Sequence, residues 1–237
     1  YDNADVADGV VTINLVLASY QGNGVWQITV SRSSVQDVTY NSVVCSGNTY
    51  GITDVNQNSQ SVLVIWDQIT VRSYSVSDGR TDINDNVNVD VTIEFEYDDS
   101  PVTSGTVTIN ALSASHQGGG VWRIVESRAT VQLVLYNTVT CSGNSYEITD
   151  VNQNSQSASV IWDRITVRSY TVIDSRVDIN DAVNIDVLIE YEYDDTAVTD
   201  GTVTIESISA THQGSGIWRI TDTKSSVQSV IYNTVAC

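Results

Sequence analysis

The sequence contains no methionine, a single lysine (Lys224), and only 10 lysine and arginine residues against 29 aspartate and glutamate residues. Its formal net charge at pH 7 is -19. Proteins that bind nucleic acids neutralise phosphates with lysine and arginine, so this composition argues against a nucleic-acid partner. It argues against an anionic membrane surface for the same reason. The missing methionine indicates a mature or excised piece of a longer chain.

Long apolar runs are also missing. No stretch approaches the roughly 20 apolar residues that a membrane-spanning helix needs, so we expect no membrane insertion in this segment. No segment has a convincing helical period. Hydrophobic residues nevertheless make up 41% of the chain, and five of them are tryptophan. Such a composition is typical of a folding sequence and not of a disordered one.

What the chain does contain is a repeat. Similar residues recur every 96 positions, which is the separation between Tyr1 and Tyr97 in the sequence. A third copy begins at Tyr193. The segment YDDSPVTSGTVTI at Tyr97 returns as YDDTAVTDGTVTI at Tyr193. A fixed period of this kind indicates an array of one structural unit. An enzyme needs one well-made site, whereas an array supplies length, spacing and self-contact.

Alternating apolar and polar residues predict β-strands. In the run 87–97 every second residue is apolar, which is typical of a strand with one buried and one solvent-exposed face. The next strand is expected over 106–111. Gly-rich turns separate further alternating runs, and for the equivalent Gly24, Gly120 and Gly216 we expect a positive φ. About seven short strands per copy predict a sandwich. The expected fold is all-β, with tandem antiparallel Ig-like β-sandwich domains and a 96-residue repeat.

Domain boundaries are expected next to Asp67 and Asp163, inside the runs VIWDQITVRSY and VIWDRITVRSY. A cut at the repeated tyrosines would split a hairpin. With the boundaries at Asp67 and Asp163, residues 1–66 are the C-terminal part of one Ig-like domain, 67–162 are a complete domain, and 163–237 are the N-terminal part of a third. The connecting runs contain neither Gly nor Pro, so we expect stiff coupling between neighbouring domains.

Acidic and amide side chains cluster at two equivalent places. The residues are Asp78, Asp82, Asn84, Asp85, Asp174, Asp178, Asn180 and Asp181. Calcium takes 6–8 oxygen ligands of this kind, so the clusters are candidate Ca²⁺ sites, and calcium is the one cofactor considered. The runs lack the order of an EF-hand and its terminal Glu. The same residues are also typical of a turn followed by the solvent-exposed face of a strand. The sequence leaves both interpretations open.

Residues for catalysis are sparse. His116 and His212 align with Tyr20 in the first copy, so we expect neither a shared catalytic base nor a shared metal ligand at this position. Serine and aspartate abound, but without a triad-like setting. No Gly-rich phosphate loop lies between a strand and a helix. We therefore expect that the chain is not an enzyme and has no catalytic residues.

Each copy contains one cysteine, at Cys45, Cys141 and Cys237. Equivalent positions in successive domains lie roughly a domain length apart, far beyond the ~7 Å Cα separation that a disulfide allows. We expect small buried side chains, because free cysteine is among the most buried residue types. Interchain disulfides are the alternative, and the sequence does not decide between the two.

The repeated tryptophans have two interpretations. Trp26, Trp122 and Trp218 could form a platform that stacks against a sugar. However, Trp122 alternates in phase with Ile124, as a core residue would. Trp66 and Trp162 continue the apolar face of their own runs and are expected in the core or at a domain joint. We favour the core interpretation for Trp26, Trp122 and Trp218.

The loop YDDSPVTSGTVTI at Tyr97, followed by a Gly turn and VWRI at Val121, resembles the tandem Ig-like domains of bacterial and archaeal surface proteins. The long, near-identical copies resemble giant archaeal cell-surface repeat proteins. The resemblance covers the first half of each unit. It implies an extracellular stalk, fibre or adhesin without catalysis.

The expected function is therefore structural: an extracellular filament, stalk or cell-surface matrix that self-associates. The alternative is a cell-surface adhesin or glycan-binding module that holds a surface ligand. Repetition, stiff joints and the absence of a site shared by all copies favour the structural function. The expected location is extracellular or on the cell surface.

Overall fold

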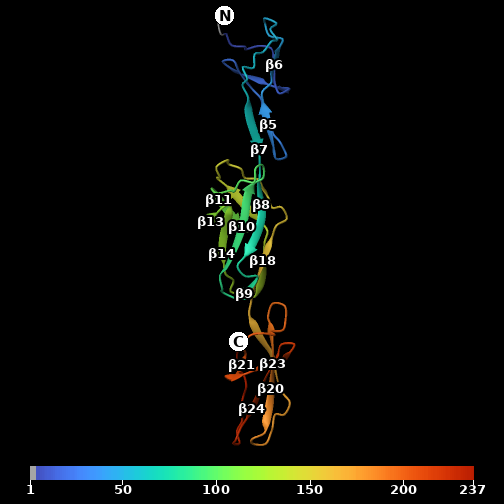
Figure 1. The fold of residues 1–237 in the computed structure, drawn as a ribbon, viewed down its shortest axis with the longest axis vertical. Coiled ribbons are helices and arrows are strands. Elements are labelled where there is room, and N and C mark those ends of the chain that lie inside the picture. Colours follow the sequence, from blue (N-terminus) through green and yellow to red (C-terminus); the bar gives the residue numbers. More distant parts are fainter. Residues whose placement is uncertain (1–3) are drawn as a thin grey trace. The chain divides into compact units, whose positions relative to one another are not determined.

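The computed structural model describes residues 4–237 (Figure 1). All regular structure in this range is β-strand, so the prediction of an all-β fold is confirmed. Most strands pair antiparallel, as predicted, but some pair parallel, which was not predicted. Among these residues there is no helix long and apolar enough to cross a membrane.

Contacts within the chain define two compact units. One consists of the chain up to Ser73 together with Val91–Trp122 and Thr138–Gln156. The other consists of Tyr74–Asp90, Arg123–Asn137 and Ser157–Cys237. Three strands run from one unit into the other: β8 (Ile69–Val76), β10 (Val87–Phe95) and β14 (Val121–Glu126). The domain boundaries expected at Asp67 and Asp163 stay a prediction.

Seven strands open the first unit. They are β1 (Val10–Ile13), β2 (Val16–Leu17), β3 (Ser19–Gly22), β4 (Val25–Gln27), β5 (Gln36–Tyr40), β6 (Val43–Ser46) and β7 (Val62–Trp66). They form a sheet in the order β2-β1-β6 and two antiparallel pairs, β3-β4 and β5-β7. The small core of this part consists of Val11, Ala18 and Cys45, against which Trp26 packs.

The first unit continues with five more strands. They are β11 (Thr106–Ile109), β12 (Leu112–Ser113), β13 (Ser115–Gly118), β16 (Val139–Ser142) and β17 (Val151–Asn152). Strands β12-β11-β16 form one antiparallel sheet, whereas β13 and β17 are the outer strands of the sheet β13-β14-β10-β8-β17. Strand β17 pairs parallel with β8 through Val151 and Ile69.

Strand β10 lies at the centre of that five-stranded sheet (Figure 1). Its residues Val87, Val89, Val91 and Ile93 are fully buried, and the residues between them are half-buried. The predicted alternation is therefore confirmed here. The strand ends at Phe95, two residues earlier than the pattern predicts, and Tyr97 is exposed in the turn that follows.

The second unit contains a three-stranded sheet in the order β15-β18-β9. Its strands are β9 (Arg80–Asp82), β15 (Gln132–Tyr136) and β18 (Ala158–Asp163). Strand β18 pairs antiparallel with β15 on one side and parallel with β9 on the other. This central position buries its side chains Val160 and Trp162 completely.

The remaining strands of the second unit form a sandwich. They are β19 (Ile165–Val172), β20 (Ala182–Tyr191), β21 (Thr204–Ile205), β22 (Ile208–Ser209), β23 (Thr211–Gly214), β24 (Ile217–Thr223) and β25 (Val235–Ala236). Two antiparallel sheets result, β19-β20-β24-β23 and β22-β21-β25. One core joins the two sheets, because Val187 on β20, Trp218 on β24 and Ile205 on β21 belong to a single buried cluster. The predicted antiparallel sandwich is confirmed in this part.

Candidate functional site

The predicted calcium residues lie in turns. The amide of Asp85 donates to the carbonyl of Asp82 at 3.2 Å, and the amide of Asp181 donates to the carbonyl of Asp178 at 3.1 Å. Within each turn one asparagine has a positive φ, 70° at Asn84 and 69° at Asn180. Among residues 4–237 no three His, Cys, Asp or Glu side chains are grouped so as to hold a metal ion. The turn interpretation accounts for these contacts, and calcium binding stays the untested alternative.

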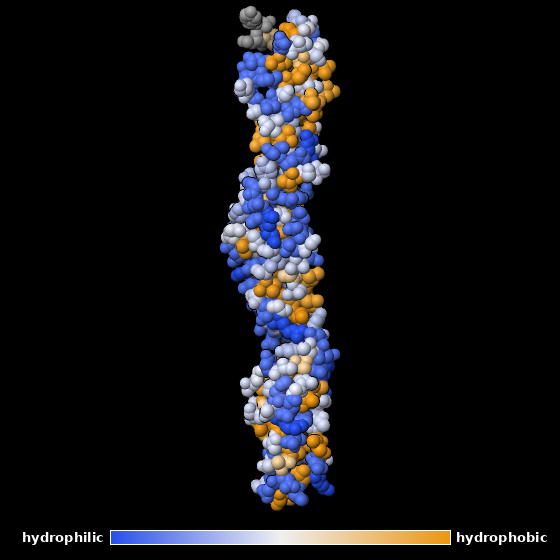
Figure 2. All heavy atoms as spheres, turned by 45° about the vertical axis from the view of Figure 1, so that its right-hand side comes forward, coloured by the Kyte–Doolittle hydropathy of each residue, from blue (hydrophilic) through white to orange (hydrophobic). Residues whose placement is uncertain are grey.

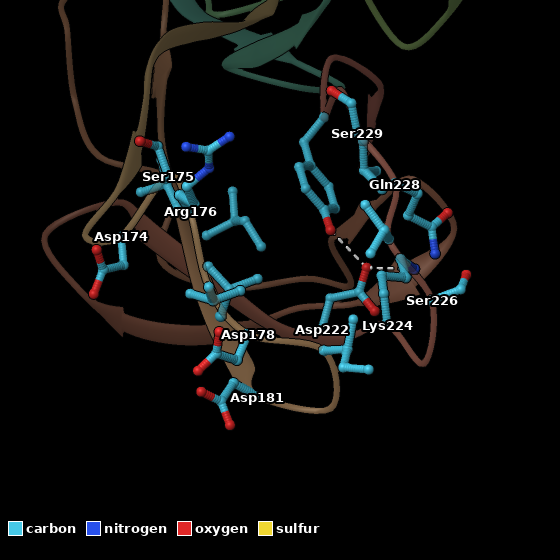
Figure 3. A pocket seen from close by; sticks show the side chains of 18 of the residues that line it. Asp174, Ser175, Arg176, Asp178, Asp181, Asp222, Lys224, Ser226, Gln228 and Ser229 are labelled. Atoms are coloured by element: carbon cyan, nitrogen blue, oxygen red, sulfur yellow. Dashed lines mark hydrogen bonds and ion pairs between the residues drawn. The ribbon is translucent and has the colours of Figure 1, made fainter.

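The other two members of the clusters lie nearby. The carboxylate of Asp78 accepts a hydrogen bond of 3.1 Å from the amide of Arg80, which is a turn contact. Its counterpart Asp174 lines a groove in the second unit, as do Asp178 and Asp181 (Figure 3). Three of the predicted residues thus share one groove, without converging on a common point.

This groove has a volume of about 620 Å³. Residues between Tyr170 and Ile185 form one wall, and residues between Asp222 and Tyr232 form the other. Figure 3 shows Arg176 and Ser229 on opposite sides of it. The residues 228–232 belong to no strand, and Val227, Val230 and Ile231 are exposed. The groove is therefore an open, partly apolar slot between two segments of the second unit.

An ionic group anchors the second wall. The Asp222 carboxylate accepts a hydrogen bond of 2.6 Å from the Tyr232 hydroxyl and lies 2.7 Å from the Lys224 ammonium. Lys224 first, and then Tyr232, hold the pKa of Asp222 below its usual value. Burial, together with the charge of Asp222, raises the pKa of Tyr232 to about 12. At neutral pH the tyrosine therefore stays protonated and keeps donating to the carboxylate.

Two aspartates at the expected domain joints each accept a pair of backbone hydrogen bonds. One oxygen of Asp67 accepts from the amides of Gln68 at 2.8 Å and Tyr97 at 2.9 Å. One oxygen of Asp163 accepts in the same way from Arg164 at 2.8 Å and Tyr193 at 3.0 Å. Each aspartate thus fastens the start of one strand to the turn that ends the neighbouring strand.

The second oxygen of Asp163 faces a cation. Asp163 is only 2% exposed, and its Oδ2 has no hydrogen-bond partner but lies 3.7 Å from the Arg80 guanidinium. Arg80 also contacts Asp194 at 2.5 Å and stands over the ring of Tyr191. A hydrogen bond from Thr196 and the charge of Arg80 lower the pKa of Asp194. Arg80 therefore compensates a buried carboxylate at the joint.

The tryptophans pack inward. Trp122 and Trp218 are each 4% exposed, and their indole nitrogens donate to the carbonyls of Val102 and Val198 at 2.9 Å in both cases. Because these rings are covered, they offer no platform for stacking a sugar. The core prediction is confirmed for them and for Trp162. Trp26 donates to the carbonyl of Val6 in the same way but is only half-buried, as is Trp66.

The histidines and cysteines form no reactive constellation among the residues that the structure describes. The rings of His116 and His212 pack against Trp122 and Trp218, with 5.0 Å between centroids in each pair. Cys45 and Cys141 are free and buried, as predicted, and burial raises the pKa of the Cys141 thiol. Cys237 is free and exposed, which differs from the prediction of a buried side chain for all three.

Sequence reasoning missed three parts of these sites. It did not assign a role to Arg80, to the pair formed by Asp222 and Tyr232, or to the groove. A signal existed for Arg80, since the sequence carries Arg176 at the equivalent position. No local pattern could have revealed the groove, because its two walls come from segments that lie far apart in the sequence.

Apolar side chains also reach the surface at several places (Figure 2). On β7 they include Leu63 and Ile65, which are 53% and 46% exposed. On β15 they include Leu133 and Leu135, which are 47% and 50% exposed. These pairs occupy alternate positions of their strands, so each pair lies on one face of its strand.

Comparison with protein-family models and with curated protein sequences finds no match. The similar solved structures include two bacterial adhesins. The Escherichia coli adhesin FdeC has 9% identity and a TM-score of 0.39, with 88% of this chain and 72% of that chain covered. The Yersinia pseudotuberculosis adhesin InvE has 14% identity and a TM-score of 0.27, with 67% of this chain and 51% of that chain covered.

Proposed function

We propose that this chain is a structural, non-catalytic segment of an extracellular cell-surface protein of the adhesin kind. In this role its β-modules serve as a spacer or stalk. The observation that carries the proposal is a set of polar contacts at the expected joints. Asp67 and Asp163 accept the same two backbone hydrogen bonds in two places along the chain. Each aspartate links a strand start to a turn within its own expected domain, while Arg80 of the expected domain 67–162 contacts Asp163 and Asp194 and stands over the ring of Tyr191 in the next one. Contacts across the joint resist bending between successive modules.

The remaining chemistry is consistent with a spacer. The Trp122 and Trp218 rings, which are large repeated side chains, serve internal packing. The acidic composition, with a net charge of -19, favours solubility and separation of chains. Neither the inward packing of the tryptophans nor the acidic composition requires that the chain bind a substrate.

Labelling of intact cells tests the location. Antibodies raised against this chain should decorate the outer surface of unpermeabilised cells in immunogold electron microscopy, and external protease should remove the label. Label that appears only after permeabilisation contradicts the proposal.

Exchange of the joint aspartate tests the spacer role. We expect Asp163→Ala to increase the flexibility of the purified chain, measured as broader distance distributions between spin labels on Ser159 and Ser209. The matched control is Asp174→Ala, at an exposed position of the same unit. Equal distance distributions for the two variants would show that the contacts of Asp163 do not limit the flexibility of the chain.

A second candidate function is direct adhesion by this segment. The exposed pairs Leu63 with Ile65 and Leu133 with Leu135 favour it, since apolar groups gathered on a surface often mark binding sites. If it holds, the purified chain binds a glycan array or a cell surface, and the double variant Leu133→Ser, Leu135→Ser loses that binding. A chain that binds nothing in either form leaves the spacer role as the function.

A further inference from the structure

The sheet β2-β1-β6 in the first unit has one face on its core and one face turned away from it. Val11 of β1 belongs to the core. Its neighbour Thr12 pairs with Leu17 on β2 and with Val44 on β6. Alternate residues of a strand share a face, and directly paired residues lie on the same face. Val10, Thr12, Leu17 and Val44 therefore form the outer face of this sheet.

Most of the outer face is apolar and exposed. Leu17, Val10 and Val44 are 69%, 50% and 49% exposed. Leu15, in the turn between β1 and β2, is 89% exposed and has a positive φ of 68°. A bulky residue rarely adopts this conformation. The chain thus holds a large apolar side chain in solvent at a conformational cost. We call Val10, Leu15, Leu17 and Val44 the apolar patch.

The other copies of the repeat carry different residues on the same face. In the second copy, on the sheet β12-β11-β16, the positions of the patch hold Thr106, Ala111, Ser113 and Thr140. In the third copy they hold Thr202, Ser207, Ser209 and Ala236. All eight of these residues are exposed, including those in the middle of the sequence. Exposure is therefore a property of this face in every copy and does not depend on the chain ends, whereas the apolar character is specific to the first copy.

The patch lies in the part of the sequence that is poorest in charge. No charged residue occurs between Gly9 and Ser31 or between Val38 and Thr53, and these stretches contain β1, β2 and β6. Two copies that each have a net charge of -19 repel one another. The repulsion between surfaces is weakest where neither carries charge. A charged partner would find no opposite charge in these stretches, so the patch matches an uncharged apolar surface such as itself.

The size of the patch fits a weak interface between two copies. Apolar patches of a few hundred Å² on a monomer often mark interaction sites, and four valine and leucine residues with exposures of 49% to 89% reach about this size. A contact between the same patch of two copies buries it twice. The buried area then approaches the roughly 1,000 Å² at which specific association begins.

We propose that the outer face of β2-β1-β6 is a docking surface for a second copy of this chain, which binds through the same face about a two-fold axis. The two sheets pack face to face, as the sheets of a sandwich do, and the apolar patch of each copy is covered by that of the other. This contact goes beyond the spacer role, because it joins one chain to another. A chain that did not associate would leave the proposed location and the joint contacts unaffected.

Sedimentation of the whole purified chain at rising concentration tests the proposal. A reducing agent is present, so that the exposed thiol of Cys237 forms no disulfide. We expect an equilibrium of monomer and dimer with a dissociation constant of about 1 µM or weaker, because the interface is small. Hydroxyl-radical footprinting should show that oxidation of Leu15 and Leu17 falls at concentrations where the dimer forms, whereas oxidation of Leu133 does not.

A variant with the residues of the second copy removes the patch. It carries Val10→Thr, Leu15→Ala, Leu17→Ser and Val44→Thr, and should dimerise at least about tenfold more weakly, because most of the apolar area is gone. The same residues occupy these positions in β12-β11-β16, so the fold should persist, as circular dichroism can show. The matched control is Leu133→Ser with Leu135→Ser, which removes leucines that are 47% and 50% exposed on β15 and should leave the dimer intact.

Three outcomes would overturn the assignment. The first is a chain that stays monomeric up to about 1 mM, beyond the range of specific association. The second is a dimer that the patch variant retains, or that the control dissolves equally. The third is a monomeric chain that binds a glycan array or a cell surface and loses this binding in the patch variant alone, since the patch would then serve a partner other than a second copy.

Discussion

At the residue scale, ion pairs between neighbouring strands are the most regular electrostatic feature. The Arg219 guanidinium donates two hydrogen bonds of 2.6 and 2.7 Å to the carboxylate of Asp186. Arg123 makes the same two bonds to Asp90, at 2.6 Å each. Both pairs join adjacent strands on the solvent-exposed face of their sheet. Paired guanidinium and carboxylate groups of this geometry give direction as well as attraction.

These contacts predict sensitivity to acid. The hydrogen bonds from Arg219 hold the pKa of Asp186 below its usual 3.8, and those from Arg164 lower the pKa of Glu192. A carboxyl group whose pKa is lower when folded contributes stability above its unfolded pKa and loses it as pH falls through the folded value. We therefore expect the free energy of unfolding to fall as pH drops below about 4.

Urea unfolding between about pH 7 and about pH 2.5 measures this effect, since that range spans the carboxyl pKa values. The Asp186→Asn variant should lose less stability over the acid range than the unmodified chain, because it has one fewer carboxyl group to protonate. Arg219→Gln serves as the matched control and should flatten the curve in the same way. Parallel curves for all three chains would contradict the role of the pair.

Single residues also show how far the sequence could be interpreted. The alternation of β10 was readable because every second residue is Val, Ile or Phe. The turn at Asn110 and Ala111 was not, and the strand expected to reach Ala111 ends at Ile109. Both turn residues have a positive φ, 47° and 66°, and alanine rarely adopts such a conformation. The sequence therefore carried the strand pattern but not this turn signal.

At the element scale, pairings between distant segments were the part that could not be predicted. The parallel contacts of β17 with β8 and of β18 with β9 join strands roughly 80 residues apart, and nothing local encodes them. The aspartates of the calcium prediction illustrate the same limit. Their spacing was visible, but only the fold determines that they face turns and the groove.

The turn before β14 offers a test at this scale. Gly119 and Gly120 both have a positive φ, 56° and 77°. A Cβ on Gly120 would lie 2.7 Å from the carbonyl oxygen of Ile93, whereas a Cβ on Gly119 would meet open space. The predicted positive φ at Gly120 is confirmed, and the close approach of backbone is an additional reason for glycine.

Alanine at each glycine separates the two effects. Gly119→Ala should cost about 1–2 kcal/mol, because an L-residue then adopts a left-handed conformation. Gly120→Ala should cost clearly more, because the backbone around Ile93 must also move. The measurement is the free energy of unfolding in urea. Similar losses for the two variants would show that the close approach to Ile93 does not constrain this turn.

At the scale of the whole molecule, charge dominates. Lysine and arginine number 10 against 29 acidic residues, and an excess of one sign destabilises a compact state by self-repulsion. Salt at physiological strength screens charges beyond about 8 Å. Any cation should therefore raise the melting temperature, and this general effect must be distinguished from a bound calcium ion.

Melting curves at matched ionic strength make that distinction. We expect NaCl and CaCl₂ to raise the melting temperature equally, because the backbone contacts of Asp82 with Asp85 and of Asp178 with Asp181 are those of turns. An ion that binds only the folded chain must stabilise it further. An additional rise with CaCl₂ that a chelator reverses, and that Asp178→Asn with Asp181→Asn abolishes, would establish a calcium site at the groove and correct the turn interpretation.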